Sequence, residues 1–208
     1  MVKRIFISAL LLIVCDLVAQ DSTSNKFRYQ SILKGDATIS PGFLMNRSQN
    51  NIYINGALEY FPQDKVSLRG EGFVFVGAQN KPALLKENSS LLYGACYHFH
   101  KNRLDFFIGM EVGASITKPN DVLIDSTSWR RGFTLTYSYT ETYNYKILPV
   151  ISPVTGVTFY PSNYFNFFLN VHYIRATYYG YTGGKNLSLD ELRIAAGLGF
   201  LIHVRKPH

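Results

Sequence analysis

Two histidines stand two residues apart, His98 and His100, and Asp105 follows five residues after the second. Imidazole nitrogens and a carboxylate oxygen bind zinc when they converge at about 2 Å from the ion. Alternate residues of a β-strand face the same way, so these groups can converge if the segment is a strand. His172 and His203 lie in later segments, and we expect the side chains of all four histidines to point to the same, inward side. Histidines near a strand end are more often hydrogen-bonded or solvated, so we expect no metal site and no cofactor.

Charged residues of both signs also interrupt stretches that are otherwise apolar. They could gate a narrow pore or bind an ion. A buried charge must be paired, however, and both signs are present, so we expect a polar network of structural ion pairs. The residues are Glu59, Arg69, Glu71, Asp105, Glu111 and Arg193.

The elements that position these residues are β-strands, because apolar residues recur at every second position. Ile108 and Val112 share one face of their segment, and Asp105 and Glu111 share the other. Eight segments show this alternation, which predicts about eight strands. They are residues 37–46, 52–60, 66–76, 91–100, 104–116, 147–160, 165–173 and 192–204.

Two of these segments are weaker because they contain prolines. Pro41 interrupts the first segment, and Pro149 and Pro153 interrupt the sixth. Proline has no backbone N–H to donate to a ladder. We therefore expect these prolines where the sheet is bulged or unpaired.

The distribution of charge between the two faces indicates the kind of barrel. A soluble barrel keeps its large apolar residues inside, whereas here the bulky apolar face is continuous and uncharged. Charges, amides and glycines share the opposite face. This arrangement is typical of a barrel with lipid outside and polar side chains inside.

The connections alternate in length, as expected for a bacterial membrane barrel. Short connections at 62–65, 101–103 and 161–163 alternate with long ones at 77–90, 118–145 and 177–191. Short turns face the periplasm in such barrels and long loops face outward. Aromatic residues flank both sets and predict two interfacial girdles. The periplasmic girdle is Tyr60, Phe61, Phe99, Phe106, Phe159, Tyr160 and Phe165, and the outer girdle is Tyr53, Tyr93, Tyr143, Tyr145 and Tyr173.

Composition agrees with a single membrane barrel. The chain has 208 residues, which suits one domain. Charged residues are 17%, below the roughly 25% of soluble domains. A mean hydropathy of −0.01 excludes a bundle of transmembrane helices. The net charge of +7 suits anionic lipid or lipopolysaccharide. Nucleic acid is not an expected partner of an exported protein.

The first twenty residues have the features of a secretory signal. Lys3 and Arg4 precede the apolar run 5–14, which is shorter than the ~20 residues that span a bilayer as a helix. Val18-Ala19-Gln20 offers a cleavage site. Val14 is a poor residue before Cys15 for lipoprotein processing, so lipidation is not expected. Cleavage would leave one cysteine, Cys96, and no internal disulfide.

Two runs carry a resemblance to a known family: "ALEYFPQDKVSLRGEGFVF" at 57–75 and "LRIAAGLGFLIHV" at 192–204. Together with the export signal, they resemble small OmpA-like outer-membrane β-barrels. The resemblance covers residues 37–204. It implies an up-and-down antiparallel transmembrane barrel in the cell outer membrane of a Gram-negative bacterium, inserted by the barrel assembly machinery.

The resemblance also implies a division of the chain. Residues 1–20 would be a signal peptide, 21–36 a short periplasmic segment, 37–204 the barrel and 205–208 a tail. Related barrels often end on an aromatic residue that the assembly machinery recognises. This chain continues through Arg205-Lys206-Pro207-His208, so recognition would use Phe200, Ile202 and Val204.

Three function classes remain open. A structural or interaction barrel is favoured, with loop 118–145 binding an envelope protein or ligand through Tyr- and Arg-rich chemistry. A small pore or lipid-handling channel is the alternative. A lipid hydrolase is less favoured, because the sequence has no GxSxG and no strand histidine faces lipid, so we expect no enzyme and no catalytic residues. The candidate loop residues are Trp129, Arg130, Arg131, Tyr137 and Tyr139.

Overall fold

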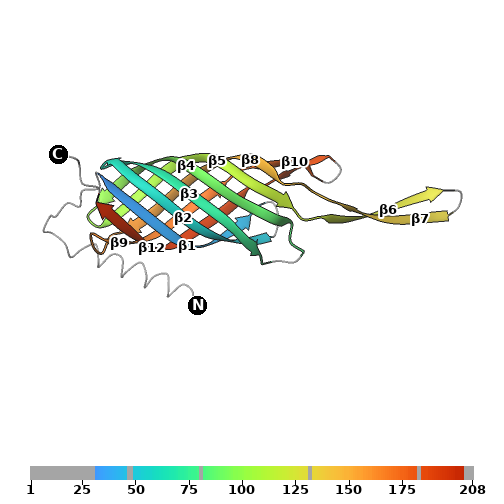
Figure 1. Ribbon diagram of the computed structural model, residues 1–208, viewed down its shortest axis with the longest axis horizontal. Helices are drawn as coiled ribbons and strands as arrows, with labels where there is room; N and C mark the ends of the chain where they lie inside the picture. Colours follow the sequence, from blue (N-terminus) through green and yellow to red (C-terminus); the bar gives the residue numbers. More distant parts are fainter. Residues whose placement is uncertain (1–30, 46–48, 80–81, 131–132, 182–183, 204–208) are drawn as a thin grey trace, which may run out of the picture.

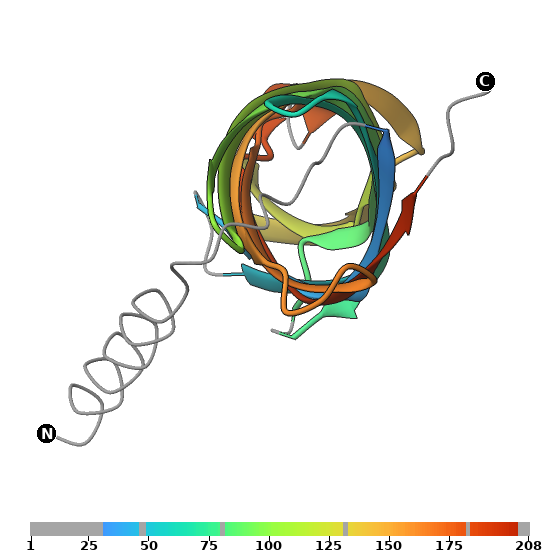
Figure 2. The same ribbon diagram turned by 90° about the vertical axis from the view of Figure 1, so that its left-hand side faces the viewer.

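The computed structural model describes residues 31–45, 49–79, 82–130, 133–181 and 184–203. Within these ranges eight antiparallel strands form one closed barrel, in the order β1-β12-β9-β8-β5-β4-β3-β2. Figure 2 shows the closed ring of strands along the barrel axis. The barrel strands are β1 (Ile32–Leu44), β2 (Gln49–Gln63), β3 (Val66–Ala78), β4 (Leu85–Lys101), β5 (Leu104–Pro119), β8 (Lys146–Phe159), β9 (Phe165–Ile174) and β12 (Glu191–His203). The predicted all-β fold and its eight barrel strands are confirmed.

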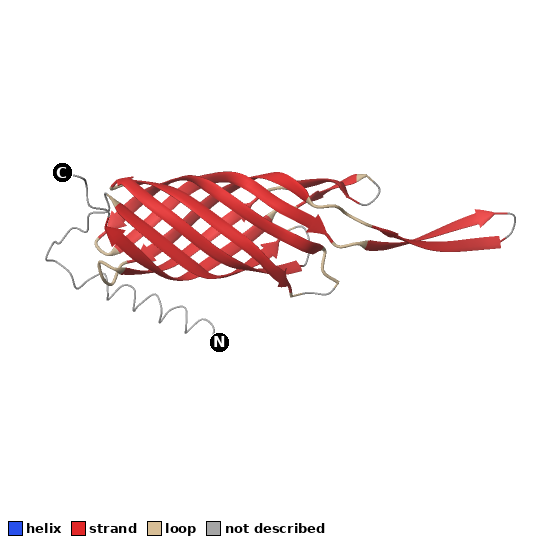
Figure 3. Cartoon of the chain, viewed as in Figure 1, coloured by secondary structure: helices blue, strands red, loops and turns tan. Residues whose placement is uncertain are grey.

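No helix in the described residues is long and apolar enough to cross a membrane. The strands instead run obliquely along the barrel wall (Figure 3).

Two further hairpins extend the barrel at one end. They are β6 (Val122–Arg130) with β7 (Phe133–Glu141), and β10 (Thr177–Tyr181) with β11 (Lys185–Ser188). Figure 1 shows the β6–β7 ribbon projecting well beyond the barrel wall. The long connections 118–145 and 177–191 are therefore largely regular strand.

The first strand begins five residues earlier than the sequence predicts. β1 starts at Ile32, so residues 32–36 belong to the barrel and not to a separate periplasmic segment. Lys34 and Asp36 are buried inside the barrel. Because both are charged, the start of the strand does not show the alternation of apolar residues by which strands are predicted. The proposed signal peptide 1–20, the rest of segment 21–36 up to residue 30, and the tail 205–208 lie outside the described residues.

The two faces of the barrel follow the predicted alternation. On β5, Ile108 is 58% exposed on the outside, whereas Asp105 and Glu111 are fully buried inside. Leu198 on β12 is 60% exposed, whereas Arg193 on the inward face of the same strand is fully buried. The wall thus presents an apolar outer surface and encloses polar side chains.

The prolines lie where the ladders are interrupted. The pairing of β1 with β12 runs to Ala37 and resumes at Gly42, on either side of Pro41. In this gap the Ser40 hydroxyl donates to the Ile194 carbonyl at 2.7 Å. Pro153 lies between Val154, where the β8–β9 ladder begins, and an isolated bridge at Ile151. The predicted unpaired positions are therefore confirmed on one side of each strand. On the other side Pro41 pairs with Ile52 of β2. Pro149 and Pro153 pair with Ala114 and Met110 of β5.

The chain reverses tightly at the end that holds the start of β1 and the end of β12 (Figure 1). Only Asp64 and Lys65 separate β2 from β3, and only Asn102 and Arg103 separate β4 from β5. Asn102 takes a φ of 57°, a left-handed conformation that asparagine tolerates better than most residues. Long connections therefore all lie at the opposite end.

An arginine at Ile108 tests the outward face. We expect Ile108→Arg to destabilise the folded barrel by about 2–4 kcal/mol, because it places a charge in lipid. Leu123→Arg is the matched control, since Leu123 is also exposed but lies on β6, outside the barrel. The measurement is urea unfolding in lipid vesicles, read by heat-modifiable gel migration. Equal stability of both variants would show that the outer surface does not contact lipid.

Candidate functional site

The structure places all six predicted charged residues inside the barrel. Each of them is at most 2% exposed: Glu59, Arg69, Glu71, Asp105, Glu111 and Arg193. Three further buried charges join them, Lys34, Asp36 and Glu191. The sequence reading missed these three because they lie in the first residues of β1 and β12, before the predicted strand starts. Continuing the period of two toward the N-terminus of each strand would have found them.

Arg69 is the centre of the main network. Its Nε lies 3.1 Å from Glu71 and 3.4 Å from Glu111, and its terminal nitrogen lies 3.4 Å from Glu59. The carboxylate of Asp36 is 4.0 Å away. One guanidinium therefore compensates four carboxylates from β1, β2, β3 and β5. A rigid planar fork of five N–H donors suits this role.

Lys34 extends the network toward the short-turn end. Its ammonium lies 3.2 Å from Asp36 and 3.2 Å from Glu59, and it donates to the Thr158 hydroxyl at 3.2 Å. Thr158 is on β8, on the far side of the barrel from β2. The lysine therefore connects strands across the lumen.

A second, smaller network lies nearer the long-loop end. Arg193 donates through Nε to Glu191 at 2.9 Å, and its guanidinium carbon lies 3.9 Å from the centre of the Tyr53 ring. Glu191 also accepts hydrogen bonds from Tyr53, Asn51 and Asn88. This pair is balanced in charge and surrounded by neutral donors.

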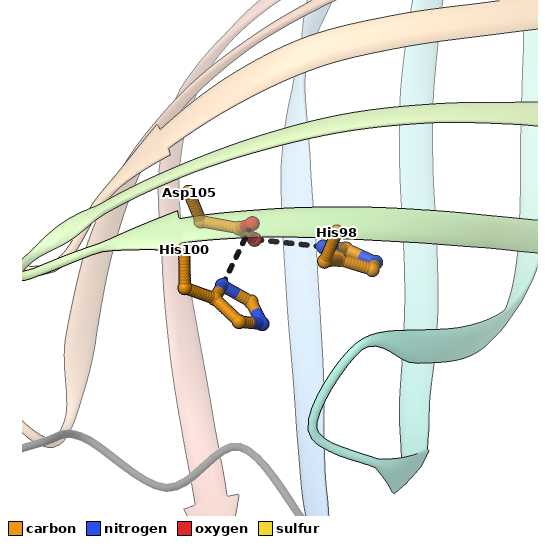
Figure 4. A group of neighbouring side chains, drawn as sticks. All are labelled: His98, His100 and Asp105. Carbon is orange, nitrogen blue, oxygen red and sulfur yellow. Dashed lines mark hydrogen bonds and ion pairs between the residues drawn. The ribbon is translucent and has the colours of Figure 1, made fainter.

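Three histidines complete the interior. His98 lies 2.8 Å and His100 lies 2.9 Å from the carboxylate of Asp105, at the end of the lumen near the short turns (Figure 4). His172 faces Glu71 at 3.3 Å and Glu111 at 3.6 Å. His203, by contrast, is exposed on the last residue of β12. The sequence reading placed it inside; its position at the barrel rim leaves it exposed.

The main network holds more acid than fixed base. Among its described members, two fixed cations, Lys34 and Arg69, and three imidazoles face five carboxylates. The carboxylates are Asp36, Glu59, Glu71, Asp105 and Glu111. Buried charges need compensation. Neutrality of the network therefore requires three further positive charges or the protonation of carboxyl groups.

Ser67, His98 and Asp105 are hydrogen-bonded in the same order as the residues of a Ser–His–Asp catalytic triad. The Ser67 hydroxyl lies 2.8 Å from His98 Nε2, and His98 Nδ1 lies 2.8 Å from Asp105. Ser67 is fully buried, however, and its hydroxyl donates to Glu59 at 2.6 Å. A substrate has no surface at which to meet this oxygen, and a neighbouring carboxylate would oppose a developing oxyanion.

Aromatic residues close the short-turn end of the lumen. Phe61 and Tyr160 are buried with Ile32 and Leu201 in one cluster. Both aromatics were predicted in the periplasmic girdle, and this prediction is wrong. Phe61 is at an inward position of β2, and Tyr160 is the residue that directly follows β8. Both side chains therefore fill the end of the lumen.

The long-loop end also has an apolar core. Tyr53 and Tyr143 are buried in this cluster and were wrongly predicted in the outer girdle. Tyr53 is on the same face of β2 as Glu59, so its ring points inward. Tyr178 on β10 is buried there too, and this burial raises the pKa of its hydroxyl, which donates to the Asn144 carbonyl at 2.8 Å. The outer girdle keeps the exposed Tyr93, Tyr145 and Tyr173.

The candidate loop residues lie mostly on the projecting hairpin. Trp129 and Arg130 are on β6, and Tyr137 and Tyr139 are on β7. In the ladder Trp129 pairs with Thr134, and Arg130 pairs with Phe133. Tyr139 is 49% exposed. Arg131 lies outside the described residues, and so do the side chains of Trp129, Arg130 and Tyr137.

The fold and its interior define the class of protein. A closed antiparallel barrel pairs every strand edge, and its surface is apolar where a soluble barrel is polar. The buried charged side chains lie in the lumen. Only a lipid surrounding stabilises this distribution, so the chain is a transmembrane β-barrel of the outer membrane.

Comparisons with known proteins agree with this class. No protein family and no curated protein matches the sequence. Among solved structures, Neisserial surface protein A covers 83% of this chain and 96% of its own, with TM-score 0.55 and 10% identity. The N-terminal β-barrel domain of Pseudomonas aeruginosa OprF covers 83% and 98%, at TM-score 0.46 and 15% identity. Pseudomonas aeruginosa OprG covers 85% and 98%, at 0.48 and 13%. The likeness to Neisserial surface protein A shows that the chain has the fold of small outer-membrane β-barrels.

The two arginines should differ in their importance for stability. We expect Arg69→Met to lower the free energy of unfolding by about 3–5 kcal/mol, because it leaves buried carboxylates uncompensated. Arg193→Met should cost less, since Glu191 keeps hydrogen bonds from Asn51, Tyr53 and Asn88. Urea unfolding in detergent, followed by circular dichroism, measures both. A larger loss for Arg193→Met would contradict the central role of Arg69.

Proposed function

We propose that this barrel is a non-enzymatic interaction protein of the outer membrane, whose β6–β7 hairpin binds a partner outside the cell. The observation that carries the proposal is the regular ribbon itself. Nine consecutive residue pairs join β6 to β7, from Val122 with Glu141 to Arg130 with Phe133. A connection needed only to reverse the chain would be far shorter.

The register gives the ribbon two chemically different faces. Residues at every second position of a strand share a face, and paired residues of neighbouring strands share it too. Along the sequence of β7, a row of apolar and aromatic residues alternates with a row of hydroxyl residues. The first row is Phe133, Leu135, Tyr137 and Tyr139, and the second is Thr134, Thr136, Ser138 and Thr140. Aromatic residues are frequent at interaction hot spots.

The ribbon also offers backbone groups. Within the described chain, β6 and β7 form a two-stranded sheet of their own, so the outer edge of each strand pairs with no other strand. Exposed edges recruit an additional strand from a partner. A peptide segment could therefore bind along an edge while its side chains contact the aromatic row.

A recess at the root of the hairpin adds to this surface. Its volume is about 450 Å³, within the size of ordinary ligand sites. Val122 and Leu123 of β6 line it together with Leu84, Asn120 and Tyr181. The recess thus joins the hairpin to the β3–β4 connection and to β10.

The filled interior of the barrel also favours a function at the external hairpin over a function as a pore. Arg69 and Glu111 are at most 2% exposed, so water does not reach the charged middle of the lumen as it would in an open pore. An eight-stranded barrel is just wide enough for side chains to fill it. The buried Ser67 likewise speaks against hydrolysis.

Matched triple variants of the two ribbon faces test the proposal. We expect Phe133→Thr, Leu135→Thr and Tyr137→Thr together to weaken partner binding about 30-fold, the effect of losing one hot spot. The control triple is Thr134→Ala, Thr136→Ala and Ser138→Ala, which alters the opposite face and should change binding less than about twofold. Crosslinking on intact cells identifies the partner, and titration of that partner onto purified barrels measures the affinity.

Replacing residues 122–141 by a short Gly/Ser turn provides the second measurement. The barrel should stay folded and heat-modifiable, because the ribbon makes no ladder with it. If the deletion variant still captures the partner as the parent does, the proposal is refuted, and the lumen becomes the candidate binding site.

A further inference from the structure

The lumen end near the short turns has a cluster of side chains that the proposed function does not use. His98 and His100 lie on alternate positions of β4, and His100 pairs in the ladder with Asp105 of β5. Figure 4 shows both imidazoles turned toward the one carboxylate. One nitrogen of each ring and a carboxylate oxygen lie within 4.8 Å of one another.

Hydrogen bonds on the far side of each ring determine where the ring protons are. His100 Nε2 contacts the Asp64 carbonyl, which can only accept, so this nitrogen carries a proton. The Ser67 hydroxyl gives its own proton to Glu59 at 2.6 Å and therefore accepts from His98 Nε2 at 2.8 Å. In both rings, Nε2 is the protonated nitrogen.

With Nε2 protonated in both rings, the lone pair of each Nδ1 points toward the carboxylate of Asp105. A neutral imidazole has one N–H, so Nδ1 of His98 and of His100 would both be acceptors, 2.8 and 2.9 Å from Asp105 oxygens. Three acceptors at these distances repel one another unless a positive charge lies among them. An added proton removes part of this repulsion, and a metal ion between the two rings removes all of it.

A single divalent ion fits better than two extra protons. The rings of His98 and His100 are stacked with their centres 5.6 Å apart, so two imidazolium charges would repel each other. One ion replaces both charges and binds both nitrogens. It also lowers the excess of carboxylates over fixed cations in the main network from three to one.

The surroundings match those of known metal-bound histidines. Such histidines donate their second ring N–H to a carbonyl or carboxylate, which fixes the ring orientation. His100 has the Asp64 carbonyl in this position, and His98 has Ser67 and Glu59. The His100 side chain is 16% exposed, so an ion can enter and a water molecule can complete its coordination.

We propose that His98, His100 and Asp105 bind one divalent transition-metal ion at the periplasmic end of the lumen. Two imidazoles and a carboxylate suit zinc and its neighbours, whereas magnesium and calcium prefer oxygen alone. The ion joins β4 to β5 and, through Asp64, fixes the β2–β3 turn. The site is independent of the external hairpin.

A second group of possible ligands, Glu71, Glu111 and His172, differs in two ways. Arg69 already lies 3.1 Å from Glu71 and 3.4 Å from Glu111, so a cation is in place. All three residues are fully buried, which leaves no route for an ion. His172 therefore serves as an internal control.

Zinc titration of the untagged, chelator-treated protein in detergent micelles tests the site. We expect one zinc ion per chain by calorimetry and elemental analysis. His100→Asn and Asp105→Asn should each weaken binding by more than about 100-fold, since loss of an outer-shell partner alone costs about 10–100-fold. His172→Asn and His203→Asn should stay within about twofold, and heat-modifiable migration verifies folding.

The outcomes separate clearly. Cobalt substitution should give a d–d absorption spectrum in the parent protein that is lost in His100→Asn, a variant of a partly exposed residue that is expected to fold. Absence of stoichiometric zinc in the parent protein would overturn the site, and so would a zinc affinity in His100→Asn and Asp105→Asn that equals the parent's. Deletion of residues 122–141 should leave zinc binding unchanged, so failure of the hairpin proposal and failure of this one are distinguishable.

Discussion

The structure depends first on the requirement that no backbone N–H or C=O remain unpaired in lipid. Each such group costs several kcal/mol in the hydrocarbon region, and an open sheet has two edges of them. The pairing of β1 with β12, from Ile32 with His203 to Leu44 with Glu191, removes both edges. At Pro41, where this ladder is interrupted, the Ser40 hydroxyl reaches across to a carbonyl of β12. Closure therefore explains both the strand order and the local use of hydroxyl residues.

Closure with eight strands also sets the character of the interior. The lumen has room for side chains and little else, so every polar group placed inside must find a partner there. Arg69 reaches carboxylates of four strands, and Lys34 reaches across to Thr158. The same packing that satisfies these charges excludes a water-filled path through the middle. Binding sites are therefore expected at the two ends of the barrel, where side chains meet solvent.

The predictable part of the protein is the part governed by alternation. The period of two assigned Ile108 to the outside and Glu111 to the inside because a strand leaves only two directions for a side chain. It failed at strand beginnings, where Lys34, Asp36 and Glu191 interrupt the apolar pattern with charge. It also misassigned Tyr53, Phe61, Tyr143 and Tyr160, because an aromatic residue near a strand end suits both an interfacial girdle and the end of a filled lumen.

The sequence by itself determined the fold class, the number of barrel strands and six of the charges that face the lumen, since these follow from local periodicity and turn lengths. Only the tertiary structure decided which charges meet. Arg69 lies opposite Glu111, and Ser67 beside His98, because β3 and β5 are both neighbours of β4 in a curved wall. The roles of the ring nitrogens of His98 and His100 likewise depend on Asp64 and Ser67, which are more than thirty residues away in sequence. Such contacts depend on register and curvature, which no single segment of the chain encodes.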